Sequence, residues 1–232
     1  MRPDAVCAEI TTNDLDGTRE AMFPWEVVVV DEAARAVGAT FVGADWRPDL
    51  ASAESTALQA EMNPAEKTAF DAVYADFMHL FERAGARTFE FWHDHDTQER
   101  VRKIHDRMIE AGTEAAAGFW ETRNQIVVKR CMRKVMAAGA KRVLFVFGAE
   151  HKYAIEGYVK RFYGLRAEPV VRLVPHASGS LSPSIVSRWQ RNRESLARLI
   201  ETKALPPALA DQFNERYLRR LDATIEARGQ PR

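Results

Sequence analysis

Two kinds of hydrophobic spacing meet in the stretch from Arg123 to Tyr153. Its first part has apolar residues at helical spacing, and Gly139 follows where a left-handed helix cap suits glycine. Its second part, Val143 to Phe147, contains no polar residue, which is typical of a strand covered on both faces in a parallel sheet. The tetrapeptide from Gly148 to His151 therefore follows the carboxyl end of a predicted strand, where open α/β sheets bind ligands. The apolar positions of the predicted helix are Ile126, Val127, Met132, Val135 and Met136.

Two earlier segments predict further strands of the same sheet. The segments from Asp4 to Ile10 and from Thr40 to Asp45 are short and apolar, and each carries an acidic residue near its end. Between them, Glu26 to Val37 predicts a helix, and Gly38 supplies its stop. Two strands joined by a helix-length connection are typical of parallel neighbours, so both acids are expected at one edge of the sheet.

The middle of the chain predicts a helical insertion at about 63–138. Asn63, Pro64 and Glu66 have the order of a helix start with a capping box. The stretch from Phe89 to Asp96 is rich in aromatic, histidine and acidic residues and receives no assignment. The other expected boundaries are a loop from Arg47 to Thr56, a helix end near Gly85, and interruptions at Gly112 and Gly118 within an otherwise helical stretch from Thr97 to Ala138.

The last third of the chain predicts one more strand and several helices. We expect a helix from Lys152 to Phe162, a strand from Ala167 to Val174, a helix from Ser182 to about Thr202 and a charged helix from Pro206 to about Arg228. The pattern as a whole predicts an α/β fold, with a mainly parallel sheet, a helical insertion and C-terminal helices. We expect an α/β domain at 1–175 and a C-terminal helical extension at 176–232.

Charge and cysteine content narrow the classes of partner. Lys plus Arg equals Asp plus Glu at 33 each, so no overall charge draws the chain to nucleic acid or to an anionic membrane. No apolar run approaches the length of about 18 residues that a membrane-spanning helix needs, and the N-terminus has no basic segment followed by an apolar one. Cys7 and Cys131 lie in apolar surroundings and are expected to be buried thiols, which suits a reducing compartment. These observations predict a cytoplasmic protein.

Four short motifs together resemble the TraB/TIKI group, which is related to erythromycin esterase and to the haem-binding ChaN proteins. The resemblance runs from about residue 2 to 173. The motifs are the segments 2–9, 39–46, Trp120 to Asn124, and Gly148-Ala-Glu-His151. The resemblance implies a parallel sheet with two Gly-x-x-His motifs, an acidic residue after an early strand, and an arginine on a helix before the second histidine.

By this resemblance, Glu9 matches the family glutamate, Arg123 its arginine and His151 its second histidine. The first Gly-x-x-His motif would precede Glu9, and the sequence has no residues there, so we expect either a shortened start or a site that works without that half. TIKI proteins are metal-dependent proteases and erythromycin esterases are hydrolases. The resemblance therefore implies hydrolysis of an amide or ester bond in a peptide or small molecule.

Each candidate residue has a chemical and a structural interpretation. His151, close to a helix N-terminus, is expected to be a neutral imidazole that acts as a base or a metal ligand, or else it packs at the junction of strand and helix. Glu9 activates water, orients His151 or binds metal with it, or else it pairs with a basic residue. Arg123 holds an anionic group, or else it binds Glu9 or Asp45. The remaining candidate ligand-binding residues are Asp45, Asn124, Gly148 and Glu150.

Other polar clusters carry weaker signals. His93 and His95 would share a face if extended and could then bind a metal, although a solvated polar loop explains them better. We expect His79 to be packed and His105 to lie on a solvated helix face. The Pro175–Ser180 loop resembles the His-Pro-Ser loop of uracil-DNA glycosylases, with Ala177 in place of the proline and Arg188, Arg191 and Arg193 nearby. Ser178 and Ser180 lack the Gly-x-Ser-x-Gly turn of a serine hydrolase.

The sequence suggests two alternative functions. The first is a hydrolase in which His151 and Glu9 activate water, directly or through a divalent metal, while Arg123 holds an anionic group. The second is a non-catalytic protein that binds a metabolite or cofactor; a haem-like ligand is the less favoured cofactor. In both cases the expected partner is a small molecule or peptide, with no nucleic acid and no membrane.

Overall fold

The computed structural model describes residues 2–17, 19–46, 49–84, 88–168, 182–203 and 218–228. The contacts between residues divide the chain into two compact units, and each is described by itself. Unit 1 consists of residues 1–44, 133–146 and 175–232, and unit 2 consists of residues 45–132 and 147–174. The C-terminal helices thus group with the strands, and the predicted domains at 1–175 and 176–232 stay a prediction.

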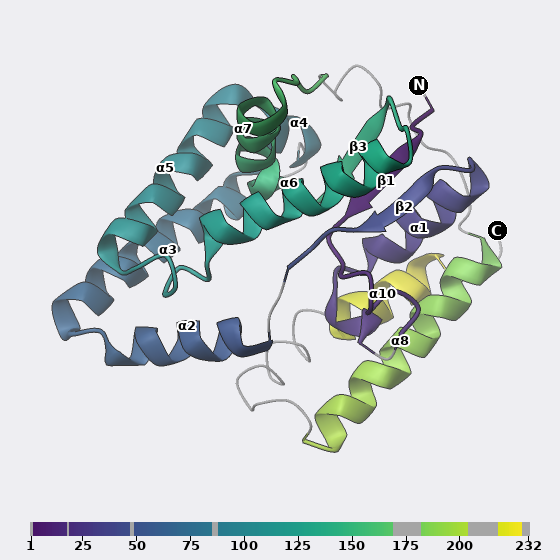
Figure 1. Cartoon of the computed structure of the whole chain (residues 1–232). Coiled ribbons are helices and arrows are strands. Elements are labelled where there is room, and N and C mark those ends of the chain that lie inside the picture. The colour runs from purple at the N-terminus through teal and green to yellow at the C-terminus, as the bar shows by residue number, and fades with distance from the viewer. Residues whose placement is uncertain are drawn as a thin grey trace. The chain divides into compact units, whose positions relative to one another are not determined.

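The sheet of unit 1 is parallel, as expected, but small. Its strands are β1 (Ala5–Ala8), β2 (Thr40–Gly43) and β3 (Val143–Val146), in the order β2-β1-β3 (Figure 1). In register, Ala5 pairs with Thr40 on one side and with Val143 on the other. β1 is buried along its whole length, whereas β3 is only partly buried. The expectation of a strand covered on both faces therefore holds for the central β1 and not for β3, because β3 lies at an edge.

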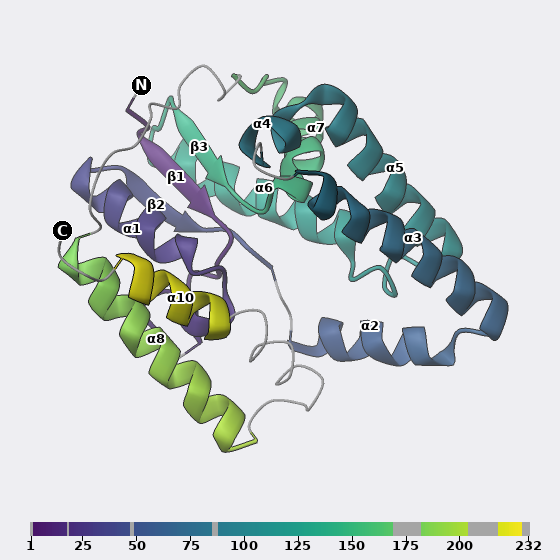
Figure 2. The same cartoon turned by 180° about the vertical axis from the view of Figure 1, so that it is seen from behind.

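Helices pack beside this small sheet and make up most of the described chain. Those of unit 1 are η1 (Glu20–Met22), α1 (Glu26–Ala36), α8 (Pro183–Glu201) and α10 (Arg219–Arg228). Figure 2 shows α1, α8 and α10 side by side. Two stop and start signals read from the sequence are confirmed, since Gly38 has a φ of 66° and Ser182 caps α8. The fold is thus broadly α/β, with a smaller sheet than the sequence led us to expect.

Arg188 ties α8 to the rest of unit 1 through buried ion pairs. Its guanidinium donates to Glu20 Oε1 at 2.9 Å and to Asp31 Oδ2 at 2.6 Å, and Asn192 Nδ2 donates to Glu20 at 2.7 Å. All four side chains are buried. Arg188 therefore does not join Arg191 and Arg193 in a basic patch for nucleic acid.

Unit 2 is helical. Its helices are α2 (Asp49–Glu61), α3 (Pro64–Ala84), α4 (Thr88–His93), α5 (His95–Ala111), most of α6 (Trp120–Ala137), η3 (Ala149–His151) and α7 (Lys152–Tyr163). Helices α3 and α5 lie side by side over a core of Phe70, Val73, Leu80, Val101 and Ile104 (Figure 1).

Several predicted boundaries in unit 2 are confirmed. The capping box is present, because Asn63 Oδ1 accepts from the Glu66 N–H at 3.0 Å and Glu66 Oε2 accepts from the Asn63 N–H at 3.0 Å. Helix α5 ends before Gly112, and Gly118 lies in the turn before α6. The predicted loop from Arg47 to Thr56 is wrong, since α2 begins at Asp49. In unit 1, Gly139 has the expected left-handed conformation, with a φ of 69°.

Part of the predicted C-terminal structure falls outside the described residues. Of the predicted strand from Ala167 to Val174, only residues 167 and 168 are described, and they are irregular. The Pro175–Ser180 loop and the first part of the last predicted helix also lie outside the described residues. In the described parts of the chain, no helix combines the length and the apolar character needed to cross a membrane.

The expectation of two free thiols is wrong. The structure contains no free cysteine, and both Cys7 and Cys131 are disulfide-bonded. Both side chains are fully buried, in line with their apolar neighbours in the sequence. Disulfides are typical of oxidising compartments, so the argument for a reducing compartment loses its basis. The cytoplasmic location stays a prediction.

Candidate functional site

His151 ends the short turn that links Gly148 to α7. The turn is the 3-10 helix η3, and α7 begins at the next residue. The Glu150 carboxylate folds back over Gly148, because a Cβ atom at position 148 would lie 2.7 Å from both of its oxygens. A side chain at Gly148 would therefore displace Glu150. The structure thus brings together two of the predicted ligand-binding residues.

A hydrogen bond to Asn124 fixes the orientation of His151. Asn124 Nδ2 donates to the Trp120 carbonyl at 2.7 Å, which leaves its Oδ1 facing His151 Nδ1, also at 2.7 Å. An amide oxygen only accepts, so Nδ1 carries the proton, and in the neutral ring Nε2 carries the lone pair. Both side chains are 0% exposed. This is the tautomer that a base or metal ligand acting through Nε2 would need, held in a place that solvent does not reach.

The indole of Trp120 connects His151 to a second buried histidine. Its ring stacks on His151 with 4.3 Å between ring centroids and on His105 with 3.9 Å. Trp120 Nε1 donates to the Tyr153 hydroxyl at 2.7 Å, and this hydroxyl lies 3.1 Å from His105 Nδ1. Residues from α5, α6 and the start of α7 therefore form one aromatic cluster with internal hydrogen bonds.

Burial keeps two members of this cluster, His105 and Tyr153, neutral. It lowers the pKa of His105 to about 4, in spite of a hydrogen bond to the Val101 backbone that acts in the opposite direction. Burial likewise raises the pKa of Tyr153 well above its usual range, although the bond from Trp120 opposes the shift. At neutral pH neither His105 nor Tyr153 is charged.

Two predictions about histidines are wrong. His105, expected on a solvated face, is 6% exposed, because it lies one turn after the buried Val101 on the inner face of α5. His79, expected to be packed, lies on the exposed face of α3, where its Nδ1 is 2.8 Å from Glu82 Oε2. In both cases one-turn spacing on a long helix, rather than the nearest neighbours in sequence, decides burial.

Arg123 binds a carboxylate of the protein itself. Its Nε donates to Asp45 Oδ1 at 2.8 Å and its Nη2 donates to Asp45 Oδ2 at 3.0 Å, a two-point contact of the kind that guanidinium groups favour. Arg130 Nη1 also donates to the Asp45 backbone carbonyl at 2.7 Å. Asp45 is 0% exposed. These contacts correspond to the structural interpretation of Arg123 given above.

Glu9 belongs to a different unit from the other predicted site residues. It directly follows β1 in unit 1, is 7% exposed, and its N–H donates to the Val146 carbonyl at 3.2 Å. The other six residues, Asp45, Arg123, Asn124, Gly148, Glu150 and His151, belong to unit 2. The predicted pairing of Glu9 with His151, for catalysis or for a metal, therefore stays a prediction. Within the described ranges, no three His, Cys, Asp or Glu side chains are placed to hold a metal ion.

His93 and His95 flank the junction of two helices rather than lying in a loop. Asp94 between them caps α5, accepting from the Thr97 N–H at 3.0 Å. His93 ends α4, where its ring stacks on Phe89 and its Nδ1 lies 2.9 Å from the Phe89 carbonyl. His95 is exposed at the start of α5. Neither residue shares a strand-like face with the other.

Both histidines line a groove in unit 2 that the sequence analysis missed. The groove has a volume of about 330 Å³ and is bounded by His93, by the first turns of α5 and by one face of α7 from Lys152 to Lys160. Gln98 holds its walls together. Its Nε2 donates to the Trp92 and Ala149 carbonyls, at 2.5 and 3.1 Å, and its Oε1 accepts from the Tyr153 N–H at 3.0 Å.

The signals for these missed residues were weak. Gln98 lies two turns before His105 and one turn after Asp94, and nothing in its neighbourhood marks it as buried. Trp120 was part of a motif and was given no role, although it lies one turn before Asn124. A comparison of the chain with protein-family models, with curated proteins and with solved structures found no match. The resemblance to the TraB/TIKI group therefore stays a prediction.

Proposed function

We propose that this chain binds a small polar molecule in the groove between α4, α5 and α7, and that it does not hydrolyse it. The observation that carries this proposal is the construction of the groove. Gln98 is buried and uses both of its amide hydrogens and its oxygen to join α4, α5 and the start of α7. A groove held open by buried hydrogen bonds needs little reorganisation to accept a ligand.

The environments of the predicted catalytic residues support binding over hydrolysis. The fork of Arg123 is closed by Asp45, so an anionic substrate would have to compete with a buried carboxylate. The Nε2 atom of His151 is buried, so water or substrate would reach it only after a movement of the chain. The groove, in contrast, is lined by exposed polar groups such as His95 and Lys160.

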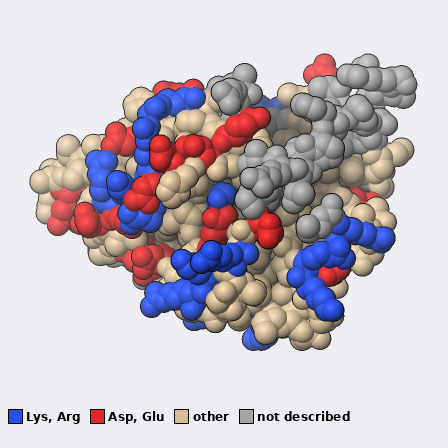
Figure 3. Space-filling view, turned by 90° about the horizontal axis from the view of Figure 1, so that it is seen from above, with Lys and Arg blue, Asp and Glu red and all other residues tan. Residues whose placement is uncertain are grey.

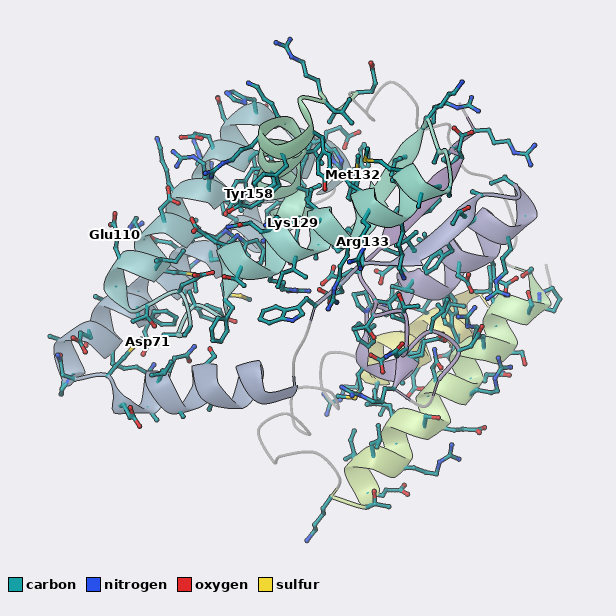
Figure 4. All side chains as sticks on the ribbon, viewed as in Figure 1. Asp71, Glu110, Lys129, Met132, Arg133 and Tyr158 are labelled. Carbon is teal, nitrogen blue, oxygen red and sulfur yellow. The ribbon has the colours of Figure 1, made fainter. Side chains whose placement is uncertain are left out.

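A variant that fills the groove tests this proposal. Gly157 lies on its α7 wall, and Gly157→Leu would place a side chain in the groove. We expect members of a library of small metabolites to raise the melting temperature of the wild type and not that of Gly157→Leu. Glu110→Leu, on an exposed position of α5 that is labelled in Figure 4, is the matched control for an added surface leucine. The proposal fails if no compound stabilises the wild type, or if every compound stabilises both proteins equally.

The second candidate is the hydrolase, and one observation favours it. Asn124 fixes the proton of His151 on Nδ1, which is how an amide partner orients a catalytic histidine for base catalysis through Nε2. In this alternative His151 and Glu9 activate water, directly or through a divalent metal, and Arg123 holds an anionic group of the peptide or small-molecule substrate. Apo structures do not exclude such a role, because catalytic groups often become accessible only with substrate bound.

The hydrolase is tested by measuring the turnover of amide and ester substrates by the wild type and by His151→Ala. Loss of turnover with an unchanged circular dichroism spectrum would support it, and equal turnover would exclude it. Metal analysis of both proteins separates the two forms of the mechanism, since a stoichiometric metal lost in the variant would make His151 a ligand. A haem absorbance band in the purified protein would instead favour cofactor binding.

A further inference from the structure

We infer that the ligand of the groove carries an anionic group, a phosphate or a carboxylate, which binds to Lys160. This inference rests on the proposed binding function and names the chemical class of the ligand. It comes from the way in which the charged side chains around the groove neutralise one another. Figure 3 shows acidic and basic side chains next to one another on the surface drawn there. The charge that the groove offers to a ligand therefore depends on which of its charged side chains form ion pairs.

Three of the four formally charged side chains in the groove have a partner of opposite charge. The Glu99 carboxylate accepts from Arg102 Nε at 2.9 Å and from Arg102 Nη2 at 2.7 Å, and this contact lowers the pKa of Glu99. Lys152 Nζ lies 2.8 Å from Glu156 Oε1. In the described part of the chain Lys160 forms no ion pair. Among the described residues, the groove therefore keeps one uncompensated positive charge, at the Lys160 end.

Gly157 keeps space open beside this lysine. It lies in the interior of α7, three residues before Lys160 and therefore on the same side of the helix. Glycine is among the weakest helix formers, so Gly157 makes α7 less stable than alanine would. Packing does not require the glycine, because a Cβ atom at Gly157 would meet no other atom within 4 Å. The missing side chain instead widens the groove next to Lys160.

The opposite wall adds hydrogen-bond donors that suit an anion. His95 is exposed in the first turn of the 17-residue helix α5, and its electrostatic interaction with Glu99, one turn further on, contributes to the lowered pKa of that carboxyl. An imidazole donates through at least one ring nitrogen in either charge state, and the N-terminal end of a helix favours negative charge. Because the Asp94 carboxylate caps this helix and Asp96 lies in its first turn, the donor that this wall offers to an anion is the His95 ring and not the helix end.

The size of the groove limits the ligand. A volume of about 330 Å³ is at the lower end of the range for small-molecule sites. A monophosphate or carboxylate with a small organic part fits this space. The groove takes such a ligand with its anionic group toward Lys160 and His95, and with the organic part along the Gly157 surface.

Three probes of one shape test the inference on the full chain. Phenyl phosphate, benzoate and phenol share a ring and differ in the charged group, and binding is followed by backbone amide shifts in NMR titrations. We expect phenyl phosphate or benzoate to bind saturably at millimolar concentration, with Gly157 among the shifted amides, and phenol to bind more weakly. The tighter of the two anions identifies phosphate or carboxylate as the preferred group.

Two variants separate the inference from the proposed function. Lys160→Gln should lower the affinity for the anionic probe by about tenfold, as expected when one hydrogen bond from a charged donor is lost. The affinity for phenol should not change. Lys67→Gln, an exposed lysine on α3, is the matched control and should change nothing. The anionic class would be overturned if phenyl phosphate bound equally to the wild type and to Lys160→Gln. It would also be overturned if phenol bound more strongly than both anions, or if neither anion bound saturably. Binding that persists in Gly157→Leu would instead overturn the groove itself as the site.

Discussion

The Oδ1 atom of Asn124 lies 2.7 Å from Nδ1 of His151, and both side chains are fully buried. Asn124 also donates to the Trp120 carbonyl within its own helix. One amide thus joins the first turn of α6 to the turn that follows Gly148. The loss of this amide would remove the acceptor that Asn124 offers to the buried ring of His151.

Asn124→Ala is therefore expected to lower the free energy of unfolding by about 1–3 kcal/mol, since the buried ring of His151 loses its hydrogen bond to the amide. Urea unfolding followed by circular dichroism measures the change. Glu121→Gln, at an exposed position of the same helix, is the control and should stay within about 0.5 kcal/mol of the wild type. A loss of less than about 1 kcal/mol for Asn124→Ala would show that the amide is not a structural tie.

Arg188→Met is expected to lower the free energy of unfolding by about 3–5 kcal/mol, because it leaves the carboxylates of Glu20 and Asp31 buried without their main partner. Arg191→Met removes a charge from an exposed position of the same helix and should change stability by less than about 0.5 kcal/mol. Equal effects of the two variants in urea unfolding would contradict the buried ion cluster.

His105 is expected to make the protein less stable in mild acid. Its pKa is lowered to about 4 in the folded state by burial, against about 6.5 in the unfolded chain. The unfolded state therefore binds the proton more readily, so the contribution of His105 is complete above about pH 6.5 and is lost as the pH falls toward about 4. The loss corresponds to about 3 kcal/mol for this group.

Unfolding free energies between about pH 7 and about pH 4 test this expectation. His105→Phe keeps an aromatic ring against Trp120 and should flatten the decrease. His79→Gln is the control, because the Glu82 hydrogen bond raises the pKa of His79 and its contribution is lost as the pH rises, which is the opposite sign. A His105→Phe profile as steep as that of the wild type would mean that other groups cause the acid sensitivity.

The disulfide-bonded state of Cys7 and Cys131 predicts how the protein reacts with a thiol-reactive dye and how reduction changes its stability. In the unfolded but unreduced protein a thiol-reactive dye should find no free thiol, and after reduction it should find both cysteines. Reduction should lower the free energy of unfolding by about 2–4 kcal/mol, chiefly through a less constrained unfolded chain. The Cys7→Ser/Cys131→Ser protein should not respond to reductant. Two reactive thiols without reduction would contradict the disulfide and restore the argument for a reducing compartment.

Local rules were sufficient for much of the secondary structure. The capping box at Asn63 and Glu66, the left-handed Gly38 and Gly139, and the Ser182 cap depend on backbone groups a few residues away, so the sequence specifies them directly. The parallel orientation of the strands follows from their connection through helices. The sequence predicted a larger sheet than the one found, because an apolar run does not show how many of its residues pair with a neighbouring strand.

Only the tertiary structure decided how the polar groups are used. The sequence alone marked His151, Asn124, Asp45 and Arg123 as residues of interest, and it left open whether they face a ligand or one another. Packing settled two of these contacts, since buried polar groups must find partners, and here Asn124 satisfies His151 while Asp45 satisfies Arg123. The groove lined by His93, His95 and α7 joins residues some sixty positions apart, a relationship that helical spacing along one segment does not reveal.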